Sequence, residues 1–361
     1  MPITIGMFGK ENLEYISTYN QRDFDNSQEQ IFYHKKLNAK IYIFSHINGF
    51  LNKPDEFYNS FDKKIIFLDN LYHEGLSILE TKKFNKINNA KKGFIWHYAE
   101  VFEEKLIEKL KELKYDYILS ASERPELENN PNFYLDRIFS FRYFRFYIGF
   151  HYLENLISKI DTPKYNRNIP KLFSYVRQTN DNAWRSKFLE LVSEISNLLE
   201  AKNSANDAYD LLFPKLKHFE AINDYLYCNF NLIFETLDYN NNTECFITEK
   251  TYKGLFYGKP FFLITSVKSI NFLKKNGFYI ANFEFLRNIQ TPQDIVKSIK
   301  LFTNWINSAS EEEIEIKYNE MLEKSLNNRN VLMNYLNDYS TYENIFEKML
   351  NGETINNKNI I

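Results

Sequence analysis

Short apolar runs alternate with longer amphipathic stretches along the first half of the chain. The apolar runs begin with Pro2–Phe8 and return at Ala39–Ile47 and Lys63–Leu71. Over Ala99–Leu113 the apolar residues recur with a helical period, and this stretch leads into a further apolar run within Tyr115–Pro125. Apolar runs of about four to eight residues, separated by helical periods, are typical of a parallel sheet with crossover helices.

The alternation breaks once and then starts again. The break falls at Ser158–Lys171, where Pro163, Pro170 and several Asn, Asp and Lys residues interrupt the apolar period. The strands expected after it are Lys171–Val176, Phe230–Thr236 and Pro260–Thr265, and the expected helices are Trp184–Glu200, Asp207–Phe219 and Thr248–Tyr257. The pattern therefore predicts an α/β fold with two Rossmann-like domains in tandem.

Two helices are expected towards the carboxyl terminus. Thr291 and Asp294 have the spacing of a capping box and open the first helix, and Ser310–Asn328 has the pattern of the second. We therefore place a first domain at residues 1–165, a second at 166–310 and a C-terminal helical segment at 311–361.

Composition and charge narrow the class of protein. The 45 basic and 47 acidic residues are well mixed, so a net charge of −2 gives no large field of one sign and does not favour a nucleic-acid partner. Cys228 and Cys245 are the two cysteines, with no CxxC and no Cys/His cluster, which argues against a zinc site or a disulfide framework. Because no apolar run reaches about 18 residues and the amino terminus lacks a signal-peptide core, we expect a cytoplasmic protein.

Polar residues follow three of the strands expected in the second half. In open parallel sheets, ligands bind at the carboxyl ends of the strands, where loops and helix N-termini meet. A helix N-terminus carries about half a positive charge, and an Arg nearby adds a bidentate contact to phosphate. The polar residues at these three ends are Arg177, Asn180, Arg185, Glu235, Thr236, Thr248, Glu249 and Lys250.

Two of these residues suggest different partners. Lys250 is a point charge suited to a phosphate oxygen, whereas Glu249 is repelled by phosphate and suits the hydroxyls of a ribose or another sugar. A site with both favours a nucleotide sugar over bare phosphate. The alternative is that Thr248 only caps a helix and that Glu249, Lys250 and Arg185 are solvated surface residues.

The second half resembles the donor-binding half of the α1,3/4-fucosyltransferase family. The resemblance is carried, in order and spacing, by Asn180–Val192, Phe230–Thr236 and Cys245–Phe278, and it covers roughly residues 115 to 285. The family pattern has a tyrosine where this chain has Phe246, and it continues differently after Glu235. The block that begins at Thr248 is also similar to that of uncharacterised glycosyltransferases of large phages.

The resemblance implies a fold, a donor and roles for residues. The fold is the GT-B arrangement of two Rossmann-like domains, with acceptor bound by the first and nucleotide sugar by the second. Arg185 and Lys250 would hold the pyrophosphate and Glu249 the ribose or sugar of a GDP- or UDP-linked donor, with Phe246 lining the same site. Such an enzyme uses protein cations in place of a metal and needs no cofactor beyond the nucleotide-sugar co-substrate.

The first half must then supply a general base for an inverting displacement, within about 3 Å of the acceptor hydroxyl. Glu123 is the first candidate, since it follows an apolar strand and precedes Arg124 and Pro125 in a segment that resembles the family's base motif. His97 is the second candidate. Both have a packing or ion-pair role as the alternative. Asp23 and Asp25 have the spacing of a metal-binding DxD, but no readable strand end precedes them, so we expect no metal.

The sequence therefore predicts an inverting, metal-independent glycosyltransferase that moves fucose or a similar sugar to an acceptor hydroxyl, most simply on a glycan. One rival is a phage-type enzyme that modifies a hydroxymethylated DNA base, for which the lysine pairs of the first half would have to form a basic groove. Another rival is a carbohydrate-binding protein of the same fold without turnover.

Overall fold

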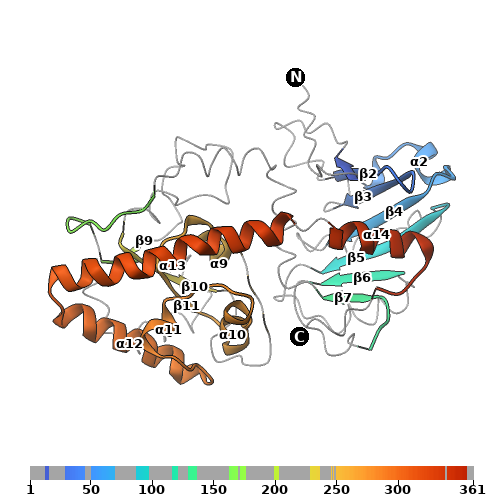
Figure 1. The fold of residues 1–361 in the computed structure, drawn as a ribbon. Helices are drawn as coiled ribbons and strands as arrows, with labels where there is room; N and C mark the ends of the chain where they lie inside the picture. Colours follow the sequence, from blue (N-terminus) through green and yellow to red (C-terminus); the bar gives the residue numbers. More distant parts are fainter. Residues whose placement is uncertain are drawn as a thin grey trace. The chain divides into compact units, whose positions relative to one another are not determined.

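The structure is a computed structural model, and it falls into two units (Figure 1). The first unit is Met1–Glu154 together with Asp338–Ile361, and the second is Asn155–Asn337. The structure describes residues 13–15, 29–44, 50–69, 87–96, 116–120, 129–135, 162–169, 171–175, 199–202, 228–235, 245, 247, 249–337 and 340–355.

A seven-stranded sheet forms the first unit, and its strands lie in chain order. The strands are β1 (Leu13–Tyr15), β2 (Glu29–His34), β3 (Ala39–Phe44), β4 (Lys64–Asp69), β5 (Ala90–Trp96), β6 (Tyr117–Ser120) and β7 (Phe133–Leu135). β1, β2 and β3 pair antiparallel, while β3 to β7 are parallel. The amino ends of β3 to β7 therefore share one edge of the sheet, and their carboxyl ends share the other.

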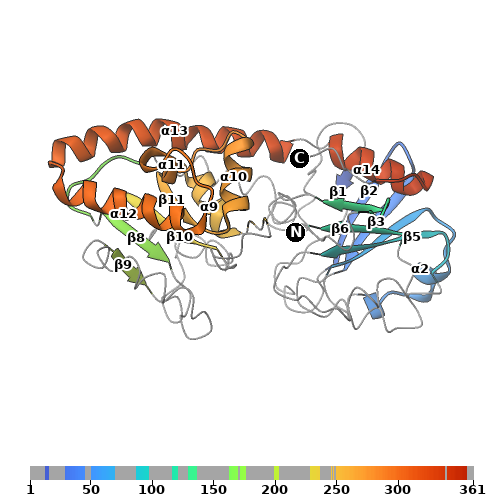
Figure 2. The ribbon, with the colours of Figure 1, turned by 90° about the horizontal axis from the view of Figure 1, so that it is seen from below.

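Two helices cover opposite faces of this sheet, α2 (Asp55–Asn59) and α14 (Ser340–Asn351) (Figure 2). Phe346 of α14 packs on Phe67 of β4, with ring centroids 6.1 Å apart. Phe57 of α2 meets Phe44 of β3 edge-on at 6.0 Å. Because side chains alternate between faces along a strand, the paired strands β3 and β4 bury apolar residues on both sides, as parallel strands under two helical layers do.

The second unit has a four-stranded parallel sheet in the order β11-β10-β8-β9. The strands are β8 (Leu172–Tyr175), β9 (Leu199–Lys202), β10 (Phe230–Phe234) and β11 (Phe261–Ile264). Among these described strands the chain first moves from β8 to one side, to β9, and later continues on the other side with β10. This reversal makes the space between β8 and β10 the topological switch point, where open α/β sheets bind ligands.

The helices of the second unit pack on both faces of that sheet. They are α9 (Glu249–Tyr257), α10 (Val267–Lys275), α11 (Asn282–Phe285), α12 (Pro292–Ser308) and α13 (Glu311–Asn337). Phe302 of α12 packs on Phe230 and Phe262 of one face, with centroids 5.1 and 4.3 Å apart. Gly254 of α9 lies against Ile233 and Phe261, which point to the other face. Both faces are therefore buried.

The tandem α/β architecture predicted from the sequence is confirmed. Strands occur at six of the expected runs, β3, β4, β6, β8, β10 and β11, and the capping box of Thr291 and Asp294 opens α12. The helix expected to run to Glu200 is wrong at its end, because Leu199–Lys202 forms β9 and pairs with β8. Its residues are strong helix formers, so pairing along β8 overrides local propensity here.

The last two helices belong to different units. α13 belongs to the second unit and packs on α9, whereas α14 belongs to the first and packs on β4. The sequence boundaries had kept residues 311–361 together as one segment.

Within the described part of the chain, no helix has the length and apolar character needed to cross a membrane.

Candidate functional site

The carboxyl end of β10 is joined to the first turn of α9 by a buried hydrogen bond. Glu235 directly follows β10, and its backbone N–H donates to the carbonyl oxygen of Ile264 at 3.0 Å. Its carboxylate is fully buried and accepts a hydrogen bond from the hydroxyl of Thr251, which is also buried. The N-terminal turn of α9 therefore lies at the carboxyl edge of the sheet and is fixed there by a charged acceptor.

The middle and the C-terminus of α9 are also held, by close packing and by hydrogen bonds. A Cβ on Gly254 would lie 2.4 Å from Cδ1 of Ile233, so a larger residue would force either that side chain or the helix to shift. At the other end, Arg329 of α13 donates to the carbonyl oxygens of Phe256 at 2.8 Å and Tyr257 at 3.0 Å. These bonds satisfy carbonyls that a helix C-terminus leaves without partners. Packing and hydrogen bonds therefore hold α9 along its length.

A second helix begins at the same edge. Two residues separate the end of β11 from the start of α10, and the second, Ser266, caps the helix with its side chain, which accepts from the N–H of Ser269 at 3.2 Å. The first turn of α10 carries no acidic residue. Thr265, between β11 and this cap, is fully buried, and its hydroxyl has no hydrogen-bond partner among the described residues. A buried hydroxyl without a protein partner suits a polar ligand group.

The electrostatic character of this edge suits an anion. Two helix N-termini each bring about half a positive charge. Lys250, the second residue of α9, is half-buried and adds a full charge at the start of that helix. The sequence reasoning missed Thr265 and Ser266. Their signal was a strand followed at once by Thr-Ser and an amphipathic helix, which is an N-cap pattern at a strand end.

The structure describes three of the residues that the sequence placed in the binding site, Glu235, Glu249 and Lys250. It brings all three to this edge, with Glu249 as the first residue of α9. Glu235 has a clear structural task in holding Thr251, and its contact with a ligand stays a prediction. The other residues predicted for this site lie outside the described ones: Arg177, Asn180, Arg185, Thr236, Phe246 and Thr248.

The two candidate bases of the first unit, Glu123 and His97, also lie outside the described residues. The strands before them are described. β5 ends at Trp96 and β6 at Ser120, and these two residues are register partners in neighbouring parallel strands. The strand ends that precede His97 and Glu123 are therefore side by side on the carboxyl edge of the first sheet.

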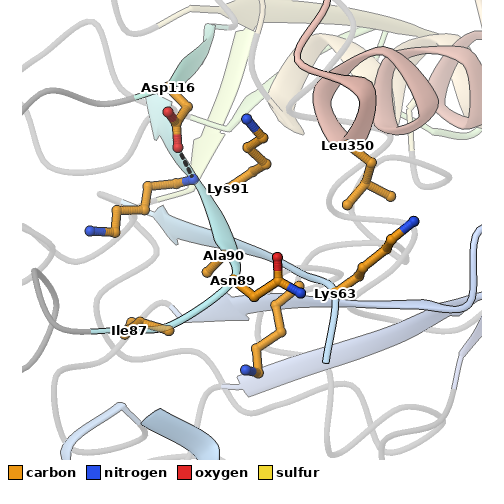
Figure 3. A pocket seen from close by; sticks show the side chains of 9 residues that line it. Lys63, Ile87, Asn89, Ala90, Lys91, Asp116 and Leu350 are labelled. Carbon is orange, nitrogen blue, oxygen red and sulfur yellow. Dashed lines mark hydrogen bonds between the residues drawn. The ribbon is translucent and has the colours of Figure 1, made fainter. Parts of the chain in front are cut away.

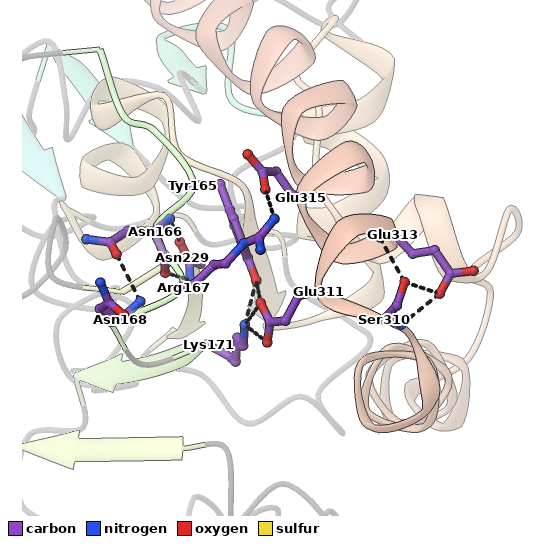
Figure 4. A network of polar contacts seen from close by, with 10 residues as sticks. All are labelled: Tyr165, Asn166, Arg167, Asn168, Lys171, Asn229, Ser310, Glu311, Glu313 and Glu315. Carbon is purple, nitrogen blue, oxygen red and sulfur yellow. Dashed lines mark hydrogen bonds and ion pairs between the residues drawn. The ribbon is translucent and has the colours of Figure 1, made fainter.

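A polar cluster at the opposite, amino edge of the second sheet has a different character (Figure 4). Lys171, directly before β8, donates to both carboxylate oxygens of Glu311 at 2.6 Å, and the hydroxyl of Tyr165 donates to Glu311 as well. These bonds lower the pKa of Glu311, and burial raises the pKa of Tyr165. The partners satisfy one another and fasten the segment before β8 to α13, so we assign the cluster to stability.

Lys259, the lysine of the Gly-Lys-Pro turn, is structural too. It is 2% exposed and donates to the carbonyl oxygen of Cys228. Burial lowers the pKa of its ammonium group. Because Lys259 precedes β11, it lies at the amino edge of the sheet, away from Lys250 and the N-terminus of α9.

Comparisons with known proteins give a likeness in fold only. No protein-family model matches the chain, and no curated protein matches it in sequence. Two crystal structures of α1,3-fucosyltransferase, with GDP and with GDP-fucose, are each 14% identical with a TM-score of 0.43. They cover 83% and 82% of this chain and 81% and 80% of their own. The catalytic domain of starch synthase IV from Arabidopsis thaliana, bound to ADP and acarbose, is 11% identical with a TM-score of 0.42, and the match covers 94% of this chain and 88% of that one.

Proposed function

We propose that the chain is a glycosyltransferase that binds a nucleotide sugar at the carboxyl edge of the second sheet. The observation that carries the proposal is that two helix N-termini and Lys250 lie at the carboxyl edge of that sheet, at the ends of β10 and β11 and next to the switch point between β8 and β10. The block Cys245–Ile264, which resembles the donor half of a fucosyltransferase, contains the first turn of α9, which lies on this edge. Chemistry and resemblance therefore point to one place.

The donor's charged part would lie across the start of α9. Backbone N–H groups of that helix, Lys250 and Arg185 would neutralise the two negative charges of the pyrophosphate. Glu249 would accept hydrogen bonds from ribose or sugar hydroxyls. The buried hydroxyl of Thr265 offers one more donor to a GDP- or UDP-linked ligand.

The transfer itself would be an inverting displacement. The acceptor hydroxyl attacks the anomeric carbon from the face opposite the nucleotide, Glu123 takes its proton, and the nucleoside diphosphate leaves with the bonding electron pair. Negative charge grows on the leaving phosphate, and the cations at α9 stabilise it, so no metal is required. A fucose donor and a glycan acceptor are the specific forms that the resemblance favours.

Calorimetric binding of GDP and UDP tests the donor site. Replacing Lys250 by alanine should weaken the better ligand about 10- to 150-fold, which corresponds to the loss of about 1.5–3 kcal/mol for one charge-assisted hydrogen bond. Lys297→Ala, on the exposed face of α12, removes an equal charge from the same unit and should leave the affinity unchanged. Equal affinities in all three proteins would remove Lys250 from the site.

A further inference from the structure

The first unit contains a positively charged pocket at the amino edge of its sheet (Figure 3). The pocket has a volume of about 420 Å³, within the range of small-molecule sites. Its lining residues are Lys63, Lys64, Ile87, Asn89, Ala90, Lys91, Lys92, Asp116 and Leu350. Four lysines thus face a single carboxylate, in a chain whose net charge is −2.

The strand register explains how the lysines gather. Lys64 pairs with Ala90 and Ile65 pairs with Lys91, so the starts of β4 and β5 lie side by side. Side chains alternate along each strand, which sends Lys63 and Lys91 to the face covered by α14. Figure 3 shows both side chains extending towards the end of that helix, which carries Leu350. A Cβ on Gly352, just past α14, would lie 3.7 Å from Nζ of Lys91.

The other groups of the pocket are already bonded. Lys64 is 3% exposed and donates to the carbonyl oxygens of Ser60 at 2.6 Å and Asn88 at 3.5 Å. One oxygen of Asp116 accepts from the backbone N–H of Lys92 at 2.7 Å. Burial lowers the pKa of both the Lys64 and the Lys92 ammonium groups, and the nearby carboxylates, Asp62 for Lys64 and Asp116 for Lys92, offset this only in part. By contrast, the structure gives the Lys63 and Lys91 ammonium groups no hydrogen bond or ion pair within its described residues.

Ordinary structural roles account for only part of this arrangement. Lysines protect the edges of sheets from pairing with other chains, but β4 and β5 are interior strands. A lysine near a helix C-terminus is favourable, which explains one of the two ammonium groups at the end of α14 but not the second, while Lys64 and Lys92 alternate to the other face of the sheet. Placing like charges together around a hollow is costly unless an anion binds there.

An exposed aromatic residue precedes Lys63 and Lys64 in the chain. The Phe61 side chain is 79% exposed, more than any other large apolar side chain that the structure describes. It lies two positions before Lys63 in the chain. Its carbonyl oxygen accepts a hydrogen bond from the side chain of Asn89, which lines the pocket. The loop that carries the ring is therefore fastened to the pocket rim. Cations next to an aromatic face are the combination that binds a phosphate together with a stacked base.

We propose that this pocket binds a nucleotide, with its phosphate at Lys63 and Lys91 and its base on the ring of Phe61. The same chemistry is offered by a free nucleotide and by one nucleotide of a single strand. The site is separate from the chemistry expected of the first unit. β5 spans seven residues, about 20 Å at the usual rise per residue, and His97 and Glu123 follow the carboxyl ends of β5 and β6. A ligand here is held away from that edge, so the inference does not depend on the proposed glycosyltransferase activity.

The test measures binding of 5′-AMP and of a labelled six-nucleotide oligothymidylate to the full chain by calorimetry and fluorescence anisotropy. Lys63→Glu and the double variant Lys63→Glu/Lys91→Glu should weaken both probes about tenfold for each charge reversed. Lys297→Glu, with the same change of charge on α12, should bind as the parent does. Lys250→Ala should also retain this binding, which separates the pocket from the proposed donor site.

Two further binding measurements test the role of the Phe61 ring and whether the ligand is a free nucleotide or part of a single strand. Phe61→Ser should weaken 5′-AMP about tenfold and leave inorganic tripolyphosphate unchanged, because tripolyphosphate has no base to stack. Equal affinity for 5′-AMP and the oligonucleotide identifies a free nucleotide as the ligand, and oligonucleotide binding that is stronger and falls steeply with salt identifies a single strand. Binding that survives Lys63→Glu, or that vanishes in Lys250→Ala, overturns the proposal, as does no binding of either probe. Lys63 is exposed, so the single variant keeps the test valid if the double variant fails to fold.

Discussion

Replacing Thr251 by valine tests whether α9 is held in place by its bond to Glu235. The two side chains have nearly the same shape, but valine cannot donate to the carboxylate. Glu235 is fully buried, so it would lose a partner that water cannot replace. A hydrogen bond to a charged group contributes about 1.5–3 kcal/mol, and this is the expected loss in the free energy of unfolding. For a domain of about 150 to 250 residues, this loss lowers the melting temperature by about 3 to 12 °C.

The same substitution should disturb ligand binding, because the first turn of α9 would no longer be fixed at the sheet edge. Calorimetry with GDP and UDP should show a loss of about tenfold, the scale of one charge-assisted hydrogen bond. Thr303→Val is the matched control. Thr303 is also fully buried, and its hydroxyl donates to the carbonyl oxygen of Ile299 at 2.9 Å in α12. This control should cost about 0.5–1.5 kcal/mol in stability and leave nucleotide affinity unchanged.

Two results would refute this reasoning. A Thr251→Val protein that melts at the parent temperature would show that the bond to Glu235 does not hold the helix. A protein that loses stability but keeps its nucleotide affinity would show that α9 is held as described and that its N-terminus is not the ligand site.

Three further predictions concern catalysis, metal and packing. Glu123→Gln should lower the single-turnover rate of sugar transfer about 10²- to 10⁴-fold while the donor affinity stays the same. If Glu123→Gln keeps full activity and His97→Gln loses it, the general base is His97. Transfer should persist in excess EDTA, and an activity that is lost there and restored by manganese would contradict the proposed role of protein cations. Gly254→Ala should destabilise the second unit by about 1–3 kcal/mol, because the added methyl group would collide with Ile233. Urea unfolding measures this loss, and an unchanged midpoint would show that the contact can relax without cost.

The strands that the sequence predicted well are those with long apolar runs. Ile65, Ile66 and Phe67 in β4 and the four residues of β11 are all buried, so their hydrophobic pattern is continuous. β5 was missed because it begins Ala-Lys-Lys-Gly, which reads as a polar turn. Its two lysines line the pocket of the first unit, and the charge that hid the strand is the feature that defines that pocket.

At the candidate site, the start of the helix was predicted but its contacts were not. The spacing of Thr248, Glu249 and Lys250 before an amphipathic run indicates a helix start, and the structure has α9 begin at Glu249. The sequence could not show that Glu235 would be buried against Thr251, since their contact joins residues 16 positions apart in the chain. Nor could it show the reversal of strand order between β8 and β10, because strand order depends on which strands pair and not on local pattern.

Incubation of the purified chain with a panel of nucleotide sugars, followed by mass spectrometry, tests the central claim most directly. The claim is that the carboxyl edge of the second sheet binds a nucleotide sugar and activates its sugar–phosphate bond. One GDP- or UDP-linked sugar should be hydrolysed slowly in the absence of acceptor, and Lys250→Ala should reduce that rate while Lys297→Ala does not. A chain that hydrolyses none of the sugars, and that binds neither GDP nor UDP, would contradict the account.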